Sequence, residues 1–242
     1  MLAATMLRAK TVVAQGLPEA NALQPLVVKH LGLTRFEEAA AAMRAFTAAR
    51  DADTPDEIWL TEHAPVYTLG LAGKHEHILN PGGISVVQTD RGGQVTYHAP
   101  GQVVAYVLVD LTRRGVTVRR LVTLIEAAVL ATLAELGVAG QRRAGMPGVY
   151  VGGSEGGPGG GAKIAALGLK VKRGCTYHGV SLNVDLDLAP FDGINPCGYA
   201  GLRVTSLKAL GMHAAVSQVG ERLAAHLEAG LMQLPAVAPI LR

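Results

Sequence analysis

Apolar residues recur every three or four positions in three stretches of the chain, which is the spacing of one face of an α-helix. The three stretches are residues 34–50, 117–137 and 216–234. In the middle stretch the apolar stripe comprises Val118, Leu121, Val122, Ile125, Val129, Leu133 and Leu136, and Gly137 follows as a stop signal. The pattern predicts three amphipathic helices that each bury one face.

Short runs rich in β-branched and aromatic residues separate these helices, and such runs are typical of strands. They occur at residues 58–63, 63–70 and 148–153, and residues 84–111 contain three runs divided by a glycine turn and a Pro-Gly turn. Residues 163–186 predict a β-hairpin that turns at residues 172–174. Because strands and helices do not alternate strictly, we predict one α+β domain in which mixed or antiparallel sheets pack against helices.

Two segments are predicted to lie outside this packed structure. Residues 1–30 form an N-terminal extension, whose first 17 residues carry two basic and no acidic residues, a faint likeness to a transit peptide. It has no apolar stretch followed by a small-residue cleavage site, so we predict no secretory signal. Residues 152–162, "GGSEGGPGGGA", are almost pure glycine and predict an exposed, flexible loop within a domain that covers residues 31–242.

The composition is that of a globular protein, with 49% hydrophobic and 17% charged residues in a chain of 242. No apolar run approaches the roughly 18 residues of a membrane helix, so we expect no membrane partner. The 22 basic and 19 acidic residues give a net charge of +3, too small to argue for nucleic-acid binding. That charge is compatible with an acidic protein partner.

The chain contains two cysteines, Cys175 and Cys197, too few for a disulfide framework or a four-sulfur metal site. No CxxC or HExxH motif indicates zinc, so we expect two free thiols in a cytoplasmic protein and no metal. Cys197 lies between Pro196, which restricts the backbone, and Gly198, which frees it, so a thiol there can be displayed at a bend. Attack by a thiolate requires a nearby cation or base to lower the thiol pKa from about 8.5. These residues alone do not choose Cys197 over Cys175, which also suits a small core position.

Three further features could carry chemistry. In "DRGGQVTYHAPGQ", residues 90–102, the two glycines let the backbone approach a ligand, although the motif is neither a P-loop nor GxGxxG and also suits an ordinary hairpin turn. Lys163 opens the apolar run "KIAALGL", where lost solvation is expected to lower its pKa; a surface lysine at a strand end is the alternative. His178 is either a catalytic group or a satisfied core histidine.

The motifs "DRGGQVTYHAPGQVVAYVLVDL", "PGVYVGG…AKIAALGLKVKRGCTYHGVSLNVDLDLAPF" and "INPCGYAGL" together resemble the lipoyl(octanoyl)transferase family. The upstream segment "DEIWLTEHAPVYTLGLAGKHEHIL" is similar to that family as well, and the resemblance runs in order from about residue 31 to residue 234. The family adopts the biotin/lipoate protein ligase fold, which agrees with the α+β prediction.

The resemblance implies that Cys197 is the nucleophile that carries an acyl thioester and that Lys163 lowers its pKa. It further implies an octanoyl pocket lined by Arg91, Gly92, Gly93, Gln94, Val95, Thr96, Tyr97, His98, Ala166, Leu167, Gly168, Gly179, Val180 and Ser181. The donor would be octanoyl-acyl carrier protein, and the acceptors would be lysines of lipoyl domains of 2-oxoacid dehydrogenases and of the glycine cleavage H protein. Such thioester exchange needs no ATP and no cofactor, and ping-pong kinetics are its expected signature.

Several roles stay open at this stage. Lys163 is a candidate general base for the acceptor lysine, while His98 and His178 either assist or only shape the site. Backbone N–H groups near Cys197 or in the Gly92 turn are candidate donors to the oxyanion. The family usually has His-Gly-Pro-Gly where this chain has Ala99 as the second residue, and we expect the alanine to be tolerated.

Three rival functions differ in what they require. An ATP-dependent lipoate or biotin ligase shares the glycine-rich turn and the lysine, but adenylation needs no cysteine nucleophile, so "NPCG" favours the transferase. A cysteine hydrolase predicts acyl transfer to water and no use for Lys163. A non-enzymatic binding module predicts that Cys197→Ala preserves all function.

Overall fold

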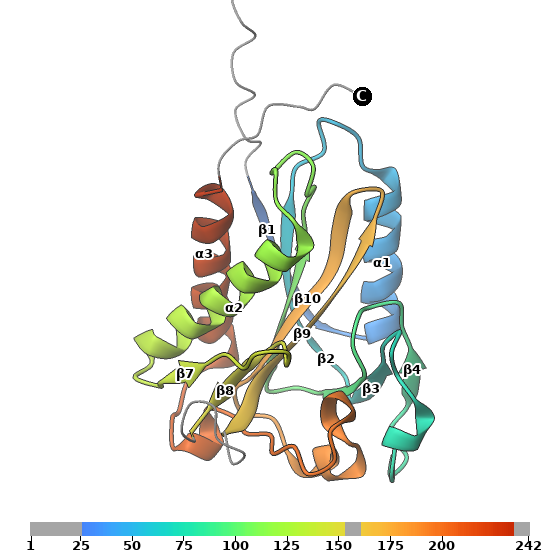
Figure 1. Ribbon diagram of the computed structural model, residues 1–242, viewed down its shortest axis with the longest axis vertical. Helices are drawn as coiled ribbons and strands as arrows, with labels where there is room; N and C mark the ends of the chain where they lie inside the picture. The colour runs from blue at the N-terminus through green and yellow to red at the C-terminus, as the bar shows by residue number, and fades with distance from the viewer. Residues whose placement is uncertain (1–25, 153–160, 235–242) are drawn as a thin grey trace, which may run out of the picture.

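The computed structural model describes residues 26–152 and 161–234, in which ten strands form two sheets (Figure 1). The strands are β1 Val27–Thr34, β2 Glu57–His63, β3 Val66–Leu69, β4 Val86–Gln88, β5 Val95–His98, β6 Gln102–Leu108, β7 Gly140–Gln141, β8 Val149–Val151, β9 Ala162–Lys172 and β10 Cys175–Asn183. The α-helices are α1 Phe36–Ala49, α2 Val118–Glu135 and α3 Val216–Met232. Four short 3-10 helices complete the elements: η1 His75–His77, η2 Ala189–Gly193, η3 Pro196–Gly198 and η4 Lys208–Leu210.

The larger sheet has seven strands in the order β1-β2-β6-β10-β9-β8-β7, and the smaller one has the order β4-β3-β5. Each sheet contains one parallel pair, β1 with β2 and β3 with β4, while the remaining pairs are antiparallel. The prediction of mixed sheets packed with helices in an α+β fold is therefore confirmed.

Helices cover both faces of the larger sheet, with α2 and α3 on one face and α1 on the other (Figure 1). Strand β6 lies between them and is an unbroken apolar run after its first residue, Gln102. Val103, Ala105 and Val107 pack into the core under α2 and α3, whereas the alternate residues Val104, Tyr106 and Leu108 pack under α1. A strand covered on both faces needs apolar residues at every position, which explains the run.

The elements with local signals were predicted correctly. The three helices begin and end within two residues of their predicted bounds, and the three runs of residues 84–111 form β4, β5 and β6. The β9–β10 hairpin turns through Arg173 and Gly174, whose φ angles of 51° and 79° are those of a two-residue type I′ connection. None of the α-helices within the described residues has the length and apolar run that a membrane crossing requires.

The predicted N-terminal boundary was wrong. Strand β1 begins at Val27, inside the predicted extension of residues 1–30, and the preceding Leu26 is buried in the core. Within the described residues, strand β1 lies at the edge of the larger sheet and pairs only with β2. Its buried and exposed positions do not alternate, so its sequence lacks the pattern by which a strand is predicted. The predicted transit-like segment, residues 1–17, lies outside the described residues, as do residues 153–160 of the predicted glycine loop.

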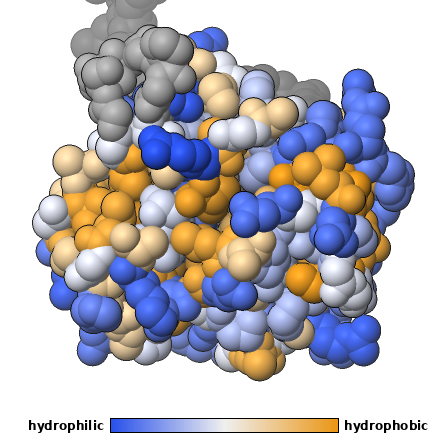
Figure 2. Space-filling model, turned by 90° about the horizontal axis from the view of Figure 1, so that it is seen from below, coloured by the Kyte–Doolittle hydropathy of each residue, from blue (hydrophilic) through white to orange (hydrophobic). Residues whose placement is uncertain are grey.

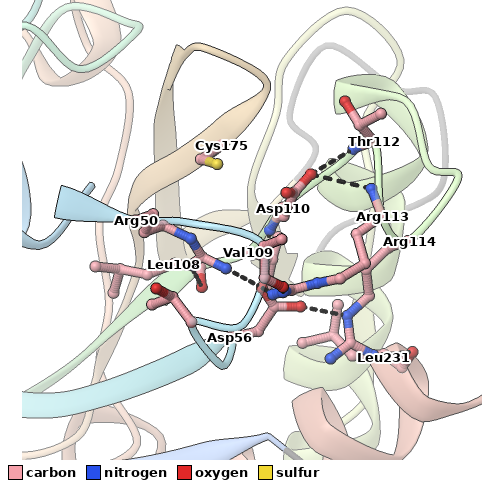
Figure 3. Close-up of polar contacts among 12 residues, drawn as sticks. Arg50, Asp56, Leu108, Val109, Asp110, Thr112, Arg113, Arg114, Cys175 and Leu231 are labelled. Carbon is pink, nitrogen blue, oxygen red and sulfur yellow. Dashed lines mark hydrogen bonds and ion pairs between the residues drawn. The ribbon is translucent and has the colours of Figure 1, made fainter. Parts of the chain in front are cut away.

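A buried carboxylate with three arginines joins the ends of several elements (Figure 3). Asp56, fully buried just before β2, forms ion pairs with Arg50, with Arg113 at 2.7 Å and with Arg114 at 2.6 Å. Burial disfavours its charge, but the N–H of Asp110 and these arginines outweigh that cost and lower the pKa of Asp56. Arg114 also donates to the Leu231 carbonyl of α3 at 3.1 Å, so the cluster links α1, β2, α2 and α3.

We expect Asp56→Asn to lower the free energy of unfolding by about 3–5 kcal/mol, because it leaves three arginines without their carboxylate. Urea unfolding at pH 7 measures this, with Asp53→Asn, an exposed neighbour, as the matched control. Since folding lowers the pKa of Asp56, its contribution is present above the unfolded value near 4 and is lost as the pH falls through the folded value. Equal unfolding midpoints for the two variants would contradict the prediction.

Candidate active site

A cavity of about 330 Å³ with a mostly apolar lining lies between the β9–β10 hairpin, the turn before β5 and the short helix η3. The segments between β10 and α3 lie at the lower end of the molecule (Figure 1), where apolar side chains gather among hydrophilic ones (Figure 2). Of the residues expected to form the pocket, those that line the cavity are Arg91, Gly92, Gly93, Gln94, Val95, Thr96, His98, Ala166, Leu167, Gly168, Gly179, Val180 and Ser181. Lys163 and Cys197 line it too.

Lys163, the second residue of β9, is buried with 4% of its surface exposed. Its Nζ donates to the Pro147 carbonyl at 3.0 Å and to Cys197 Sγ at 3.0 Å, and it lies 5.1 Å from the centre of the Tyr150 ring. Gly148 permits this approach: its φ is +125°, and a Cβ there would lie 2.6 Å from the Ala165 carbonyl oxygen and 3.2 Å from Lys163 Nζ. Burial, backbone shape and three contacts thus hold the ammonium in one position.

Cys197 occupies the middle of η3, half-buried, in the left-handed conformation with φ 57° and ψ 17°. A non-glycine residue in that region costs about 1–2 kcal/mol, and such strain is concentrated at functional sites. The bend is closed by hydrogen bonds from the Gly198 N–H to the Asn195 carbonyl and from the Tyr199 N–H to the Pro196 carbonyl. The predicted bend is confirmed, and its strain falls on the cysteine itself.

The charge state of Lys163 differs from the expectation. Burial lowers the pKa of a lysine, but attraction to Cys197 and the hydrogen bond to its sulfur outweigh burial and raise the pKa of Lys163. The expected lowering was therefore wrong for the resting protein, because the partner that reverses it is distant in the sequence. Lys163 is an ammonium at neutral pH.

Arg91 is a second buried cation beside the cavity, and its hydrogen bonds go to neutral groups. It donates to the Thr68 hydroxyl and carbonyl and to the carbonyls of Gly92 and Gln94. Burial lowers the pKa of Arg91 to about 10, so it remains charged at neutral pH. These bonds shape the glycine turn, in which the Gly92 N–H donates to the Leu169 carbonyl at 2.9 Å. Of the candidate oxyanion donors, near Cys197 or at Gly92 and Gly93, the Gly92 N–H is therefore already engaged within the protein.

His98 and His178 line the cavity as neutral rings. Burial lowers the pKa of His98 to about 3 and also lowers that of His178, although Asp90 lies 2.8 Å from His178 Nε2. His98 is held by Gln102 and Thr68, and the Phe36 ring stacks on both histidines at 6.2 and 6.4 Å. Among the open roles, this arrangement favours a geometric one for both.

Tyr97 does not line the cavity, so its inclusion in the pocket was wrong. Side chains alternate along β5, and the Tyr97 ring points to the other side, 5.3 Å from the Tyr67 ring and 5.5 Å from Phe191. Sequence reasoning missed lining residues that come from distant segments: Phe36, Val104, Tyr106, Val122, Gly145, Met146, Pro147 and Tyr199. Of these, Val104, Tyr106, Pro147 and Tyr199 lie within the motifs that carried the resemblance and could have been found there.

The remaining expectations concern Ala99 and Cys175. Ala99 is buried and has no positive φ, whereas Gly101 carries a φ of +93°, so the alanine is tolerated as expected. Cys175 is a buried residue at the start of β10, and burial raises the pKa of its thiol. Of the two thiols, Cys197 is the one whose sulfur accepts a hydrogen bond from a lysine ammonium. Among the described residues, no group of three His, Cys, Asp or Glu side chains is placed to hold a metal ion.

Comparison with known proteins gives a consistent result. A family model described as the lipoyl protein ligase A/B catalytic domain matches residues 35–228. The chain is 56% identical over 222 residues to an octanoyltransferase of Aromatoleum aromaticum, covering 92% of this chain and 91% of that protein. It is 57% identical over 203 residues to an octanoyltransferase of Dechloromonas aromatica, covering 84% of this chain and 95% of that one.

Solved structures resemble the chain in fold. A bipartite lipoate protein ligase of Thermoplasma acidophilum superimposes with a TM-score of 0.66 at 15% identity, covering 87% of this chain and 84% of that one. Biotin protein ligase of Aquifex aeolicus gives a TM-score of 0.50 at 12% identity, covering 85% and 68%. The predicted biotin/lipoate protein ligase fold is confirmed.

We expect Lys163→Met to slow alkylation of Cys197 by iodoacetamide at pH 7 at least about 10-fold, because the thiolate is the reactive form and loses the ammonium 3.0 Å away. Intact-protein mass spectrometry follows the reaction, and peptide mapping assigns the adduct. Cys175, buried and without a neighbouring ammonium, is the internal control and should remain unmodified in the folded protein. An unchanged rate would exclude activation by Lys163.

Proposed function

The chain belongs to the octanoyltransferases of the lipoyl protein ligase A/B catalytic-domain family, and from this we propose that it transfers octanoyl groups to lysines in protein lipoylation through a Cys197 thioester. The observation that carries the proposal is the 3.0 Å contact between Lys163 Nζ and Cys197 Sγ beside a mostly apolar cavity. An ammonium at that distance stabilises a thiolate, and the cavity suits an aliphatic chain.

In the first half-reaction the Cys197 thiolate attacks the carbonyl carbon of the octanoyl thioester. The tetrahedral intermediate collapses, the bond to the donor sulfur breaks, and the octanoyl group is left on Cys197. The departing thiolate takes a proton from the Lys163 ammonium, which becomes an amine. One thioester is exchanged for another, so no nucleotide is consumed.

In the second half-reaction the amine of an acceptor lysine attacks the Cys197 thioester and forms an amide. Lys163, now neutral, accepts a proton from the attacking nitrogen, and Cys197 leaves as a thiolate beside the restored ammonium. Arg91 adds a second buried positive charge near the cavity, which favours the negative charge that develops on oxygen and sulfur.

The partners follow from this chemistry. We assign octanoyl-acyl carrier protein as the donor, and lipoyl domains of 2-oxoacid dehydrogenases and the glycine cleavage H protein as the acceptors. The net charge of +3 is compatible with an acidic donor. A free thiol must stay reduced to act, so we assign the reaction to the cytoplasm, where thiols are kept reduced.

The rival functions lack a comparable observation. The ligases among the structural neighbours share 11–15% identity with this chain, which reflects the fold, whereas relatives at 53–57% identity are octanoyltransferases. An adenylating ligase has no use for a thiol paired with Lys163. A cysteine hydrolase pairs its thiol with an imidazole, whereas the hydrogen-bond partner of Cys197 Sγ is Lys163, and the two cavity histidines bond to Gln102, Thr68 and Asp90.

Incubation with octanoyl-acyl carrier protein, without ATP, should give an octanoyl adduct on Cys197 that hydroxylamine removes. Intact-protein mass spectrometry should find the adduct in the wild type and in Cys175→Ser but not in Cys197→Ser. Addition of a lipoyl domain should then discharge the enzyme and octanoylate the domain. An adduct on Cys175, or a strict requirement for ATP, would overturn the proposal.

A further inference from the structure

The second half-reaction of the proposed function leaves one proton without an acceptor. An acceptor lysine with an ordinary pKa near 10.4 arrives as an ammonium, and two protons must leave its nitrogen before the amide is complete. Lys163 can accept only one proton, because it gave up one when it protonated the donor thiolate. The first proton, which must leave before the nitrogen can attack, therefore needs another base with a route to solvent.

His77 borders the nucleophile segment and was not among the sequence candidates. A Cβ built on Gly198, the residue after Cys197, would lie 3.3 Å from His77 Nε2. Helix η1 and the segment before η3 are joined by backbone hydrogen bonds, from the Asn195 N–H to the His77 carbonyl at 2.8 Å and from the Leu79 N–H to the Gly193 carbonyl at 2.8 Å. The imidazole is thereby held against the turn that carries Cys197.

The other histidines lack this combination of position and access. The chain has eight, all within the described residues. His63, His98 and His178 are buried, and burial lowers the pKa of each. His30 lies on β1, His213 precedes α3 and His226 lies on α3. The His77 side chain, with 18% of its surface exposed, reaches both solvent and η3.

The surroundings of His77 suit proton transfer. Its Nδ1 lies 3.4 Å from Nδ2 of the Asn195 side-chain amide. With that amide turned over so that its oxygen faces the ring, Nδ1 carries the hydrogen and Nε2 is free to accept one. The charged group beside the ring is Glu76, whose Oε1 is 3.8 Å from Nε2 and which also pairs with Lys74.

We propose that His77 is the general base that removes the first proton from the incoming acceptor lysine. Nε2 takes a proton from the lysine ammonium, and the resulting amine attacks the Cys197 thioester. The nitrogen gives its second proton to the Lys163 amine as the Cys197 thiolate leaves. The imidazolium then releases its proton to solvent, so each cycle consumes one ammonium and returns one proton to water.

The test separates the two half-reactions. Octanoyl-enzyme is prepared with octanoyl-acyl carrier protein and isolated, then mixed with a lipoyl domain, and single-turnover discharge is followed by mass spectrometry from pH 5.5 to 9.5. We expect His77→Gln to slow discharge about 100-fold at pH 6.5, with the deficit shrinking as the pH rises and the acceptor lysine loses its proton unaided. Formation of octanoyl-enzyme should stay within about 2-fold of wild type.

His75→Gln is the matched control, an exposed imidazole two residues away on the same helix, and should discharge at the wild-type rate. Added imidazole should restore discharge by His77→Ala. The inference is overturned if His77→Gln discharges normally at pH 6.5, or if it slows both half-reactions equally, as a structural role would. If the wild type forms no octanoyl-enzyme, the proposed function itself fails. This outcome is seen in the first step of the experiment, before any variant is compared, so it is distinct from a failure of the His77 inference alone.

Discussion

A lysine ammonium withdrawn from water requires partners, and the arrangement of the site follows from that requirement at Lys163. The ammonium is satisfied by a carbonyl at Pro147, the ring of Tyr150 and the sulfur of Cys197. Pro147 and Tyr150 come from β8 and the residues just before it, and Cys197 comes from η3, so two separate parts of the chain converge on the charge that β9 carries. A buried charge with a missing partner is costly, which makes the convergence a condition of stability as well as of chemistry.

The protein handles its buried charges in two different ways. Asp56 gathers three arginines around one carboxylate, and this cluster links the ends of elements without facing the cavity (Figure 3). Arg91 instead donates to hydroxyl and carbonyl oxygens, which satisfy its hydrogen bonds but leave its charge uncompensated. Because the cavity histidines are neutral, Arg91 and Lys163 give the cavity a positive potential, and that potential favours an anionic sulfur or oxygen.

The sequence correctly predicted those elements of the fold whose signals lie in neighbouring residues. Helical periodicity located α1, α2 and α3, and the glycine turn located the β9–β10 hairpin, because these signals are local. The edge strand β1 was missed because its partly buried and exposed residues do not alternate along the strand. The sign of the Lys163 pKa shift was wrong, and His77 was missed, for a common reason: each depends on contact with η3, which lies far away in the sequence.

The burial of Lys163 acts in opposite directions at the two stages of the proposed cycle. In the resting enzyme the charge of Cys197 outweighs burial and keeps the lysine protonated. Acylation removes that charge while the lysine stays buried, so desolvation, the largest single influence on its pKa, is no longer opposed by the thiolate. The ammonium then gives up its proton readily to the departing donor thiolate, and the amine that remains is the proton acceptor that the second half-reaction needs. The low solvent exposure that makes the resting ion pair necessary therefore also drives its separation once the sulfur carries an acyl group.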